Sequence, residues 1–308
     1  MTTPSLLTLG PVLFNWPVDQ WRDFYARIAD EAPVDVVTLG EVVCSKRAPF
    51  FEDALPEVIE RLTDAGKQVV LASPILVTTE RERAAVRGLI GTEDLLVEAN
   101  DLGAVAQLAG RPHLVGPFVN VYNEATLTWL AARGATAVSL APELPAPSLK
   151  ALAAEAARHG VAVEAQVFGR VPLAISARCY HARAHGLHKD GCQFVCGQDA
   201  DGMDVETLDA QPFLAVNGLQ TLSHTYLCLA SELDELRAMG VSRFRLSPHT
   251  VDMVRVSSLF RDALDGRRGG AEVAAELAGM IDRAPLANGF FHDRAGAAFV
   301  GGDGAAAM

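Results

Sequence analysis

The chain of 308 residues lacks the features that would direct it to a membrane or to nucleic acid. It has no run of about 18 apolar residues, which excludes a membrane-spanning helix. Its first ten residues contain no basic segment ahead of an apolar one, so we expect no signal peptide. Positive charge is scarce: 26 Lys and Arg residues stand against 38 Asp and Glu residues, and the formal net charge is −12. We therefore expect neither nucleic acid nor anionic lipid as a partner.

Cysteine is also scarce, with five residues, and aromatic residues make up 6% of the chain. An odd number of cysteines in a chain this long is typical of a reducing compartment, so we expect a cytoplasmic protein without a disulfide framework. Two hydrolase motifs are missing as well. Neither G-x-S-x-G nor H-E-x-x-H occurs, which disfavours a serine hydrolase and a zinc metallopeptidase.

The chain does contain a repeated unit, in which a short Val- and Leu-rich run precedes an amphipathic helical stretch. Continuous apolar strands separated by helices predict a parallel sheet covered on both faces. Eight such units predict an α/β fold, a single (β/α)8 barrel of the TIM type over residues 1–300, and we expect residues 301–308 to be a disordered tail. The predicted strands are 6–13, 34–41, 68–74, 95–101, 113–123, 135–143, 161–169 and 241–250.

A long insertion, about 171–223, separates the seventh predicted strand from the eighth. Its second part predicts a β-hairpin around Asn217 and Gly218, because Asn-Gly is a strong turn signal. Insertions that follow a barrel strand lie at the C-terminal face, where barrel proteins build their sites. The insertion is therefore the first place to look for function.

Three of the five cysteines, Cys179, Cys192 and Cys196, lie in this insertion. Cys44 follows the predicted strand 34–41, so it belongs to a loop on the same face of the barrel. Because the insertion is long enough to cross the mouth, we expect these four cysteines to converge there. Cys228 lies among apolar residues at helical spacing, and we interpret it as a buried thiol of the core.

The cysteine spacing points to a metal without identifying it. Thiolates favour zinc or an iron–sulfur cluster over hard cations. Only Cys192 and Cys196 form a close pair, so spacing alone leaves iron–sulfur, zinc and no metal all open. The neighbouring Arg178, His181 and Lys189 could offset negative charge at the site. We interpret His181 and the nearby histidines at 185 and 188 as supporting or solvated residues rather than ligands.

Several other side chains lie near the ends of the predicted strands, where a substrate could bind. Glu164 needs a partner because it is a carboxylate within an apolar strand, and Arg170 or Arg178 could supply one. Ser247 also lies at a strand end, but a nucleophile would need a base directed at it. The candidates for substrate binding are Asn15, Glu41, Glu164, Arg178 and His249.

Five segments of the chain resemble the UbiV family, which belongs to the collagenase-like peptidase superfamily. The resemblance extends over nearly the whole chain, and the arrangement of the cysteines is its specific part. The segments are GPVLFNWP (10–17), LGEVVCSKR (39–47), ARCYHARAHGLHKDGCQFVC (177–196), AVNGLQTLS (215–223) and NGFFHDRAG (288–296).

This resemblance implies a cofactor, a function and partners. It implies a [4Fe–4S] cluster held by Cys44, Cys179, Cys192 and Cys196, and leaves Cys228 outside the ligand set. It also implies a heterodimer with the homologous barrel protein UbiU, with UbiT as a lipid-carrier accessory. The implied function is oxygen-independent hydroxylation of the aromatic ring of a ubiquinone precursor. Two alternatives remain: a non-catalytic subunit that carries the cluster for structure or electron transfer, and a collagenase-like peptidase.

Overall fold

Eight parallel strands close into a barrel in the computed structural model, which describes residues 4–92 and 94–301. Strands β1 to β7 lie side by side in chain order, and β11 pairs in parallel with both β7 and β1. The predicted (β/α)8 barrel is therefore confirmed. Residues 302–308 of the predicted tail lie outside the described residues. The barrel strands are β1 (Leu6–Leu9), β2 (Val36–Leu39), β3 (Gln68–Ala72), β4 (Leu96–Ala99), β5 (His113–Val115), β6 (Ala135–Ser139), β7 (Ala162–Ile175) and β11 (Arg243–Leu246).

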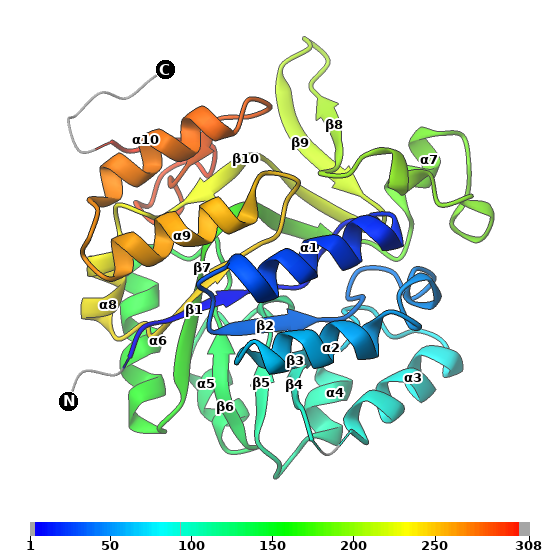
Figure 1. Ribbon diagram of the computed structural model, residues 1–308, viewed down its shortest axis with the longest axis horizontal. Helices are drawn as coiled ribbons and strands as arrows, with labels where there is room; N and C mark the ends of the chain where they lie inside the picture. The colour runs from blue at the N-terminus through cyan, green and yellow to red at the C-terminus, as the bar shows by residue number, and fades with distance from the viewer. Residues whose placement is uncertain (1–3, 93, 302–308) are drawn as a thin grey trace.

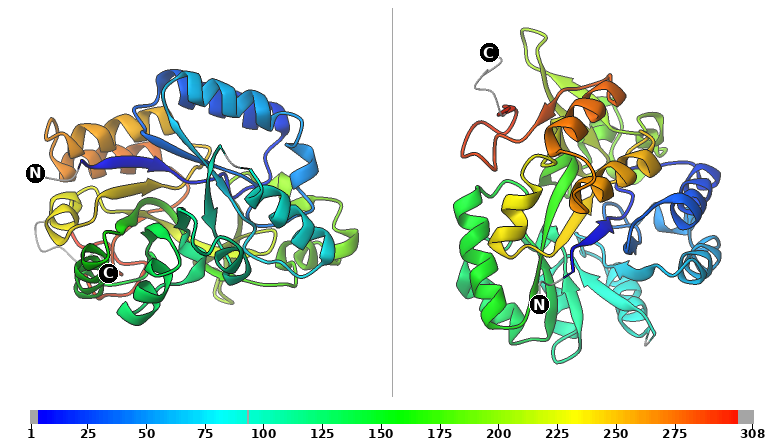
Figure 2. Two further views of the ribbon diagram at one scale, coloured as in Figure 1. Left: turned by 90° about the horizontal axis from the view of Figure 1, so that it is seen from below. Right: turned by 60° about the vertical axis from the view of Figure 1, so that its left-hand side comes forward.

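Helices alternate with these strands and cover the outside of the barrel (Figures 1 and 2). Their amphipathic sequences explain this position, because each buries one apolar face against the strands. None of the helices in the described ranges is long and apolar enough to cross a membrane. The helices outside the insertion are α1 (Val18–Glu31), α2 (Leu55–Asp64), α3 (Glu80–Ile90), α4 (Leu102–Gln107), α5 (Glu124–Ala131), α6 (Ala146–Arg158), α8 (Leu233–Met239), α9 (Met253–Leu264) and α10 (Gly270–Met280).

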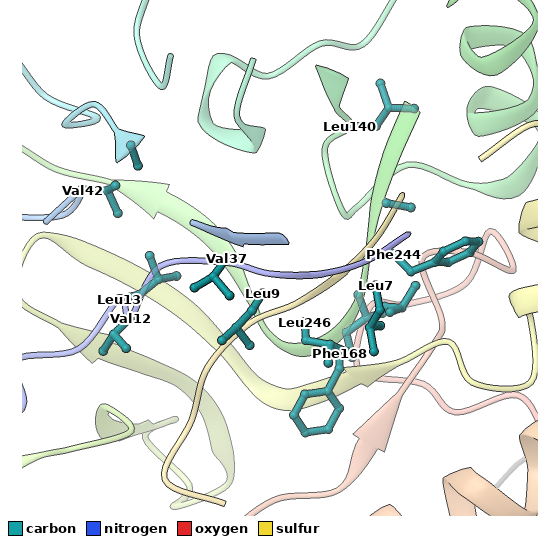
Figure 3. Close-up of a cluster of buried hydrophobic side chains, with 14 of the residues drawn as sticks. Leu7, Leu9, Val12, Leu13, Val37, Val42, Leu140, Phe168, Phe244 and Leu246 are labelled. Atoms are coloured by element: carbon teal, nitrogen blue, oxygen red, sulfur yellow. The ribbon is translucent and has the colours of Figure 1, made fainter. Parts of the chain in front are cut away.

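The main hydrophobic core lies between the strands and the helices. Leu7 of β1 and Phe244 of β11 belong to it and are fully buried (Figure 3). Inside the barrel a second, smaller apolar cluster is formed by Val36, Val70 and Leu114 together with Ala137. Strands β2 and β3 thus bury apolar side chains on both faces, which explains their apolar composition.

The insertion is built onto the second half of β7. This strand has 14 residues, and its end pairs antiparallel with β10 (Gln220–Cys228). Strand β10 pairs with β9 (Pro212–Asn217), and β9 pairs with β8 (Met203–Glu206), while the short β12 (Leu286–Ala287) pairs with β10. The predicted hairpin at Asn217 and Gly218 is present as the β9–β10 turn. The insertion, including α7 (Tyr180–Ala184), lies at one end of the barrel (Figure 1).

Cys228 is buried as predicted, with 1% of its surface exposed, but it lies in a strand and not in a helix. The helical interpretation was wrong because Tyr226, Leu227 and Cys228 are all buried at the end of β10. A strand buried on both faces has no alternation, and a short apolar run of this kind cannot be distinguished from a helix by periodicity.

Candidate metal centre

Four cysteines from two distant parts of the chain line one small cavity: Cys44, Cys179, Cys192 and Cys196. Cys44 follows β2, whereas the other three belong to the insertion. The structure thus brings together the four cysteines that the sequence predicted to converge, and it leaves Cys228 elsewhere. The other residues that line the cavity are Arg47, His181, Lys189, Phe194, Val195, Gly218 and Leu219.

Glu41 fixes the loop that carries Cys44. Its Oε1 accepts hydrogen bonds of 2.8 Å from the backbone N–H groups of Val43 and Cys44. The Glu41 side chain is only 4% exposed. Burial raises the pKa of Glu41, although Arg47 and the two N–H groups lower it in part. Glu41, a candidate for substrate binding, therefore holds the backbone around Cys44.

Arg47 brings a positive charge to the cavity, and its side chain is 1% exposed. Its Nη1 donates to the carbonyl of Leu13 at 3.2 Å, and its Nη2 donates to Oδ1 of Asn217 at 2.8 Å. Arg178, which we expected to offset negative charge here, is exposed and lies outside the cavity lining. Arg47 was missed because an arginine in a loop has no periodic pattern. The feature of the sequence that could have identified Arg47 is its position three residues after Cys44.

The cysteine sulfur atoms contact polar groups of the surrounding backbone and side chains. Sγ of Cys179 donates to the carbonyl of Gly218 at 3.2 Å and accepts from the N–H of Ala182 at 3.4 Å. Asn15, another candidate residue, places its Nδ2 at 3.5 Å from Sγ of Cys196. Burial raises the pKa values of the Cys44 and Cys196 thiols, while the Arg47 guanidinium opposes this shift. Two effects therefore oppose each other at these two sulfurs: burial disfavours the thiolate form, and the Arg47 guanidinium favours it.

His181 is fully buried beside the cysteines. Its Nδ1 lies 3.3 Å from the carbonyl oxygen of Val216, and its Nε2 lies 3.0 Å from a carboxylate oxygen of Asp199. Its ring stacks on that of His185, with the centroids 5.2 Å apart. Burial lowers the pKa of His181, against the effect of Asp199. Both ring nitrogens therefore face protein acceptors, which fits a supporting role better than that of a ligand.

The lining of the cavity fits an iron–sulfur cluster in its donor chemistry. In the described ranges, no group of three or more His, Cys, Asp or Glu side chains is arranged to hold a single metal ion. In a cluster the four thiolates bind separate iron atoms, so the sulfurs stand further apart around a common centre. The lining supplies four thiols, a buried cation and no carboxylate, which suits a soft, negatively charged group.

Glu164 is paired inside the barrel, but not with the predicted partners. Its carboxylate lies 2.8 Å from Nη1 of Arg245 and 3.3 Å from Nε of Arg243, and it accepts a hydrogen bond from Thr8. Burial alone would raise the pKa of Glu164, but the two guanidinium groups and Thr8 lower it to about 2. The prediction of Arg170 or Arg178 was wrong because the eighth strand, remote in sequence, lies beside β7.

Glu98 completes this network with a 2.6 Å ion pair to Arg245. Two carboxylates and two guanidinium groups balance one another, and each of the four residues is buried. Gly10 makes room for the network, since a Cβ there would lie 2.9 Å from Nε of Arg245. Paired charges therefore occupy part of the barrel interior, and the carboxylate of Glu164 is already engaged by Thr8, Arg243 and Arg245.

His249 is held on both ring nitrogens. Its Nε2 accepts from the backbone N–H of Arg170 at 3.0 Å, and its Nδ1 faces Oδ1 of Asp201 at 3.3 Å. Because an N–H group can only donate, Nε2 is unprotonated and Nδ1 carries the proton towards Asp201. Burial lowers the pKa of His249, although Asp201 opposes the shift. The ring therefore has no free nitrogen to act as a base towards Ser247.

Asp201 also fastens the insertion to the end of β11. Its carboxylate accepts hydrogen bonds from the backbone N–H of Thr250, at 3.0 Å, and from the hydroxyl of the same residue. Trp16 makes a further link, because its Nε1 donates to the carbonyl of Ala200 at 2.7 Å. Asp201 was missed in the sequence because an Asp in an irregular segment reads as a solvated loop residue.

These features define a class: a (β/α)8 barrel protein with a cysteine-rich insertion at one end of the barrel. The sequence model of the family described as peptidase family U32 matches residues 18–300 of this chain, and the chain therefore belongs to this family. This confirms the superfamily that the sequence resemblance indicated.

Similar solved structures include an uncharacterized B. cereus protein, with 13% identity, a TM-score of 0.40, and coverage of 79% of this chain and 60% of that one. A second is the monotopic membrane protein (S)-mandelate dehydrogenase, with 13% identity, a TM-score of 0.34, and coverage of 94% and 80%. The chain thus spans 60% of the length of the first of these proteins.

Proposed function

We propose that this protein is the iron–sulfur subunit of an oxygen-independent hydroxylase system for the aromatic ring of ubiquinone precursors. One observation carries the proposal: Cys44, Cys179, Cys192 and Cys196 line a single cavity beside the buried Arg47. The four thiols match the usual ligand set of a [4Fe–4S] cluster. The resemblance to the UbiV family supplies the substrate class.

When bound, such a cluster supplies one-electron transfer. Cys44 would hold it from the barrel side, and Cys179, Cys192 and Cys196 from the insertion. Lys46 ties the two sides together, since its Nζ donates to the carbonyl of Lys189 at 2.7 Å and contacts Oδ1 of Asp190 at 3.1 Å. Holding the ligands from two fixed segments limits the movement of the site.

Two phenyl rings lie at the outer edge of this site. The ring of Phe50, from the loop after β2, lies edge-on to that of Phe194, with the centroids 4.8 Å apart. Phe194 also lines the cysteine cavity. Apolar side chains around a metal site control the access of solvent. The pair would therefore limit contact between the cluster and water or dissolved oxygen.

The partner follows from the same resemblance. We infer a heterodimer with a UbiU-like barrel protein, a UbiT-like lipid carrier that delivers the ubiquinone precursor, and a location in the cytoplasm. Co-expression with the UbiU-like protein followed by anaerobic size-exclusion chromatography tests the dimer. Two proteins that elute as separate monomers would contradict it.

A second candidate is a subunit in which the cluster serves only structure or electron transfer. The closed charge network of Glu98, Glu164, Arg243 and Arg245 favours it, because these residues are buried and paired. Peptidase activity has less support, since both ring nitrogens of His249 are engaged and this histidine cannot act as a base towards Ser247. Binding of the ubiquinone precursor by this chain without its partner distinguishes the first two candidates, because a subunit that serves only structure or electron transfer would bind none.

The cofactor is tested on protein purified without air. We expect iron and acid-labile sulfide in a ratio near that of one [4Fe–4S] cluster, a broad visible absorption band, and an EPR signal on reduction. Protein that holds stoichiometric zinc and neither iron nor sulfide would refute the assignment. The pathway is then tested in cells grown without oxygen. Their ubiquinone content is compared between cells that carry the wild-type chain and cells that carry Cys44→Ala.

A further inference from the structure

Arg47 is the most deeply buried cation at the cysteine cavity. Its side chain is 1% exposed, whereas Lys189, which also lines the cavity, is half-buried. A charge in the protein interior acts on its neighbours through a low effective dielectric, while an exposed charge is screened by water and salt. The guanidinium of Arg47 is therefore the charge that a group bound to the four cysteines would feel most strongly.

The hydrogen bonds of Arg47 leave part of its charge uncompensated. Nη1 and Nη2 donate to the neutral acceptors Leu13 and Asn217, and Nε has no hydrogen-bond partner among the residues that the structure describes. The nearest carboxylate, that of Glu41, lies 4.0 Å away and already accepts from two backbone N–H groups. An unpartnered N–H at this degree of burial is costly unless another acceptor faces it.

We propose that Arg47 sets the reduction potential of the bound cluster by stabilising its reduced form. This inference rests on the proposed function. Reduction adds one electron to the cluster and no proton, so the reduced site carries one more negative charge. A buried positive charge lowers the energy of that state and raises the potential. Arg47 is thus a tuning residue and does not itself react.

Arg47 also has a structural role, and the experiment must separate the two. Arg47→Gln removes the positive charge. Arg47→Lys keeps the charge but loses the two guanidinium nitrogens that donate to Leu13 and Asn217. Asn217→Ala removes a hydrogen-bond partner of Arg47 and keeps the charge. Arg81→Gln is the matched charge control, because exposed Arg81 contacts the carbonyl of Ser45, next to Cys44.

The measurement is an anaerobic redox titration of the full chain with dithionite as the electron donor, followed by EPR. For Arg47→Gln we expect at least a tenfold lower ratio of reduced to oxidised cluster at a fixed potential, or about 59 mV for one electron. Arg47→Lys, Asn217→Ala and Arg81→Gln should stay close to the wild-type potential.

Each outcome decides between the two roles. A loaded Arg47→Gln protein with the wild-type potential overturns the inference, as does an equal shift in Asn217→Ala. If Arg47→Gln loses the cluster, Arg47→Lys decides: a cluster at the wild-type potential supports the charge role, and loss in both variants overturns it. Wild-type protein without iron and sulfide refutes the proposed function itself, which keeps the two failures distinct.

Discussion

The Nη2 atom of Arg47 donates a 2.8 Å hydrogen bond to Oδ1 of Asn217, which lies 170 residues further along the chain. This bond joins the loop after β2 to the turn between β9 and β10. Nδ2 of Asn217 in turn donates to the carbonyl oxygens of Cys196 and Asp199. The loop that carries Cys44 and the segment that carries Cys196 are thus fixed to each other through two side chains.

Replacing any one of the four cavity cysteines by alanine should lower the iron bound per chain. Each replacement removes one thiol from the proposed ligand set of the cluster. The matched control is Cys228→Ala, because burial raises the pKa of this thiol to about 12 and it lies outside the cavity. We expect near wild-type iron there and a loss of stability of about 1 kcal/mol. Loss of iron in Cys228→Ala, with iron retained in Cys44→Ala, would contradict the ligand set.

Gly218→Ala should disrupt the joint between the barrel and the insertion. A Cβ on Gly218 would lie 2.2 Å from Nη2 of Arg47, and the residue has a φ of +63°. Gly160→Ala isolates the backbone effect, since Gly160 has a φ of +66° and open space around it. We expect about 1 kcal/mol for Gly160→Ala and a larger loss for Gly218→Ala, measured by urea unfolding.

Iron content separates these two glycine variants further. Gly218→Ala should bind less iron than the wild type, because Arg47 must move away from the cavity. Gly160→Ala, remote from the cavity, should bind the wild-type amount. If the two variants have the same unfolding free energy and the same iron content, the close contact between Arg47 and the turn does not stabilise the site.

Glu164→Gln should destabilise the barrel by about 3 kcal/mol at neutral pH. The pKa of Glu164 falls from its ordinary value of 4.5 to about 2 on folding, despite burial, because Arg245 and Arg243 stabilise the carboxylate. Since the folded pKa is the lower one, the unfolded chain takes up this proton first as the pH falls. The stabilisation is full above pH 4.5 and disappears towards pH 2.

Urea unfolding of protein that holds no metal, with its thiols reduced, tests this prediction between pH 3 and 6. The difference in unfolding free energy between the wild type and Glu164→Gln should shrink as the pH falls. Glu60→Gln, a change of an exposed residue of α2, serves as the control and should change the unfolding free energy only slightly. A constant difference for Glu164→Gln across the range would argue against the ion pairs.

Phe194→Ala should make the proposed cluster more sensitive to oxygen. Removal of this ring opens the outer edge of the cysteine cavity, where it packs against Phe50. We expect faster bleaching of the visible absorption in air, with the iron content of the anaerobic protein unchanged. Phe213→Ala, which removes a ring that is 58% exposed on β9, should bleach at the wild-type rate.

The sequence predicted the barrel because most of the strands are rich in apolar residues and the helices between them have one apolar face. It predicted the convergence of the cysteines because strand ends fix the face on which a loop emerges. The arginine partners of Glu164 were missed, although Arg243 and Arg245 alternate with Phe244 and Leu246 in β11 and so point into the barrel. Such a pairing depends on the closure of the barrel, which local patterns do not encode.

Arg178 shows the opposite error, because the sequence placed a charge at the site that the structure does not place there. Its place next to Cys179 suggested a charge at the site, yet the chain turns into α7 there and leaves the side chain exposed. Sequence neighbours in a turn-rich segment point in different directions, so proximity along the chain predicts little about contact. Arg47 reaches the cavity because its side chain lies against the turn at Gly218.

Strand β7 runs without interruption from the barrel wall into the antiparallel sheet of the insertion. One ribbon of hydrogen bonds therefore belongs to both parts, and no flexible joint separates them along this strand. The cysteine-bearing segment is an outgrowth of the wall and not a flap. A chain cut after the seventh barrel strand would leave the far end of β7 with unpaired backbone groups, because its partner β10 would be missing.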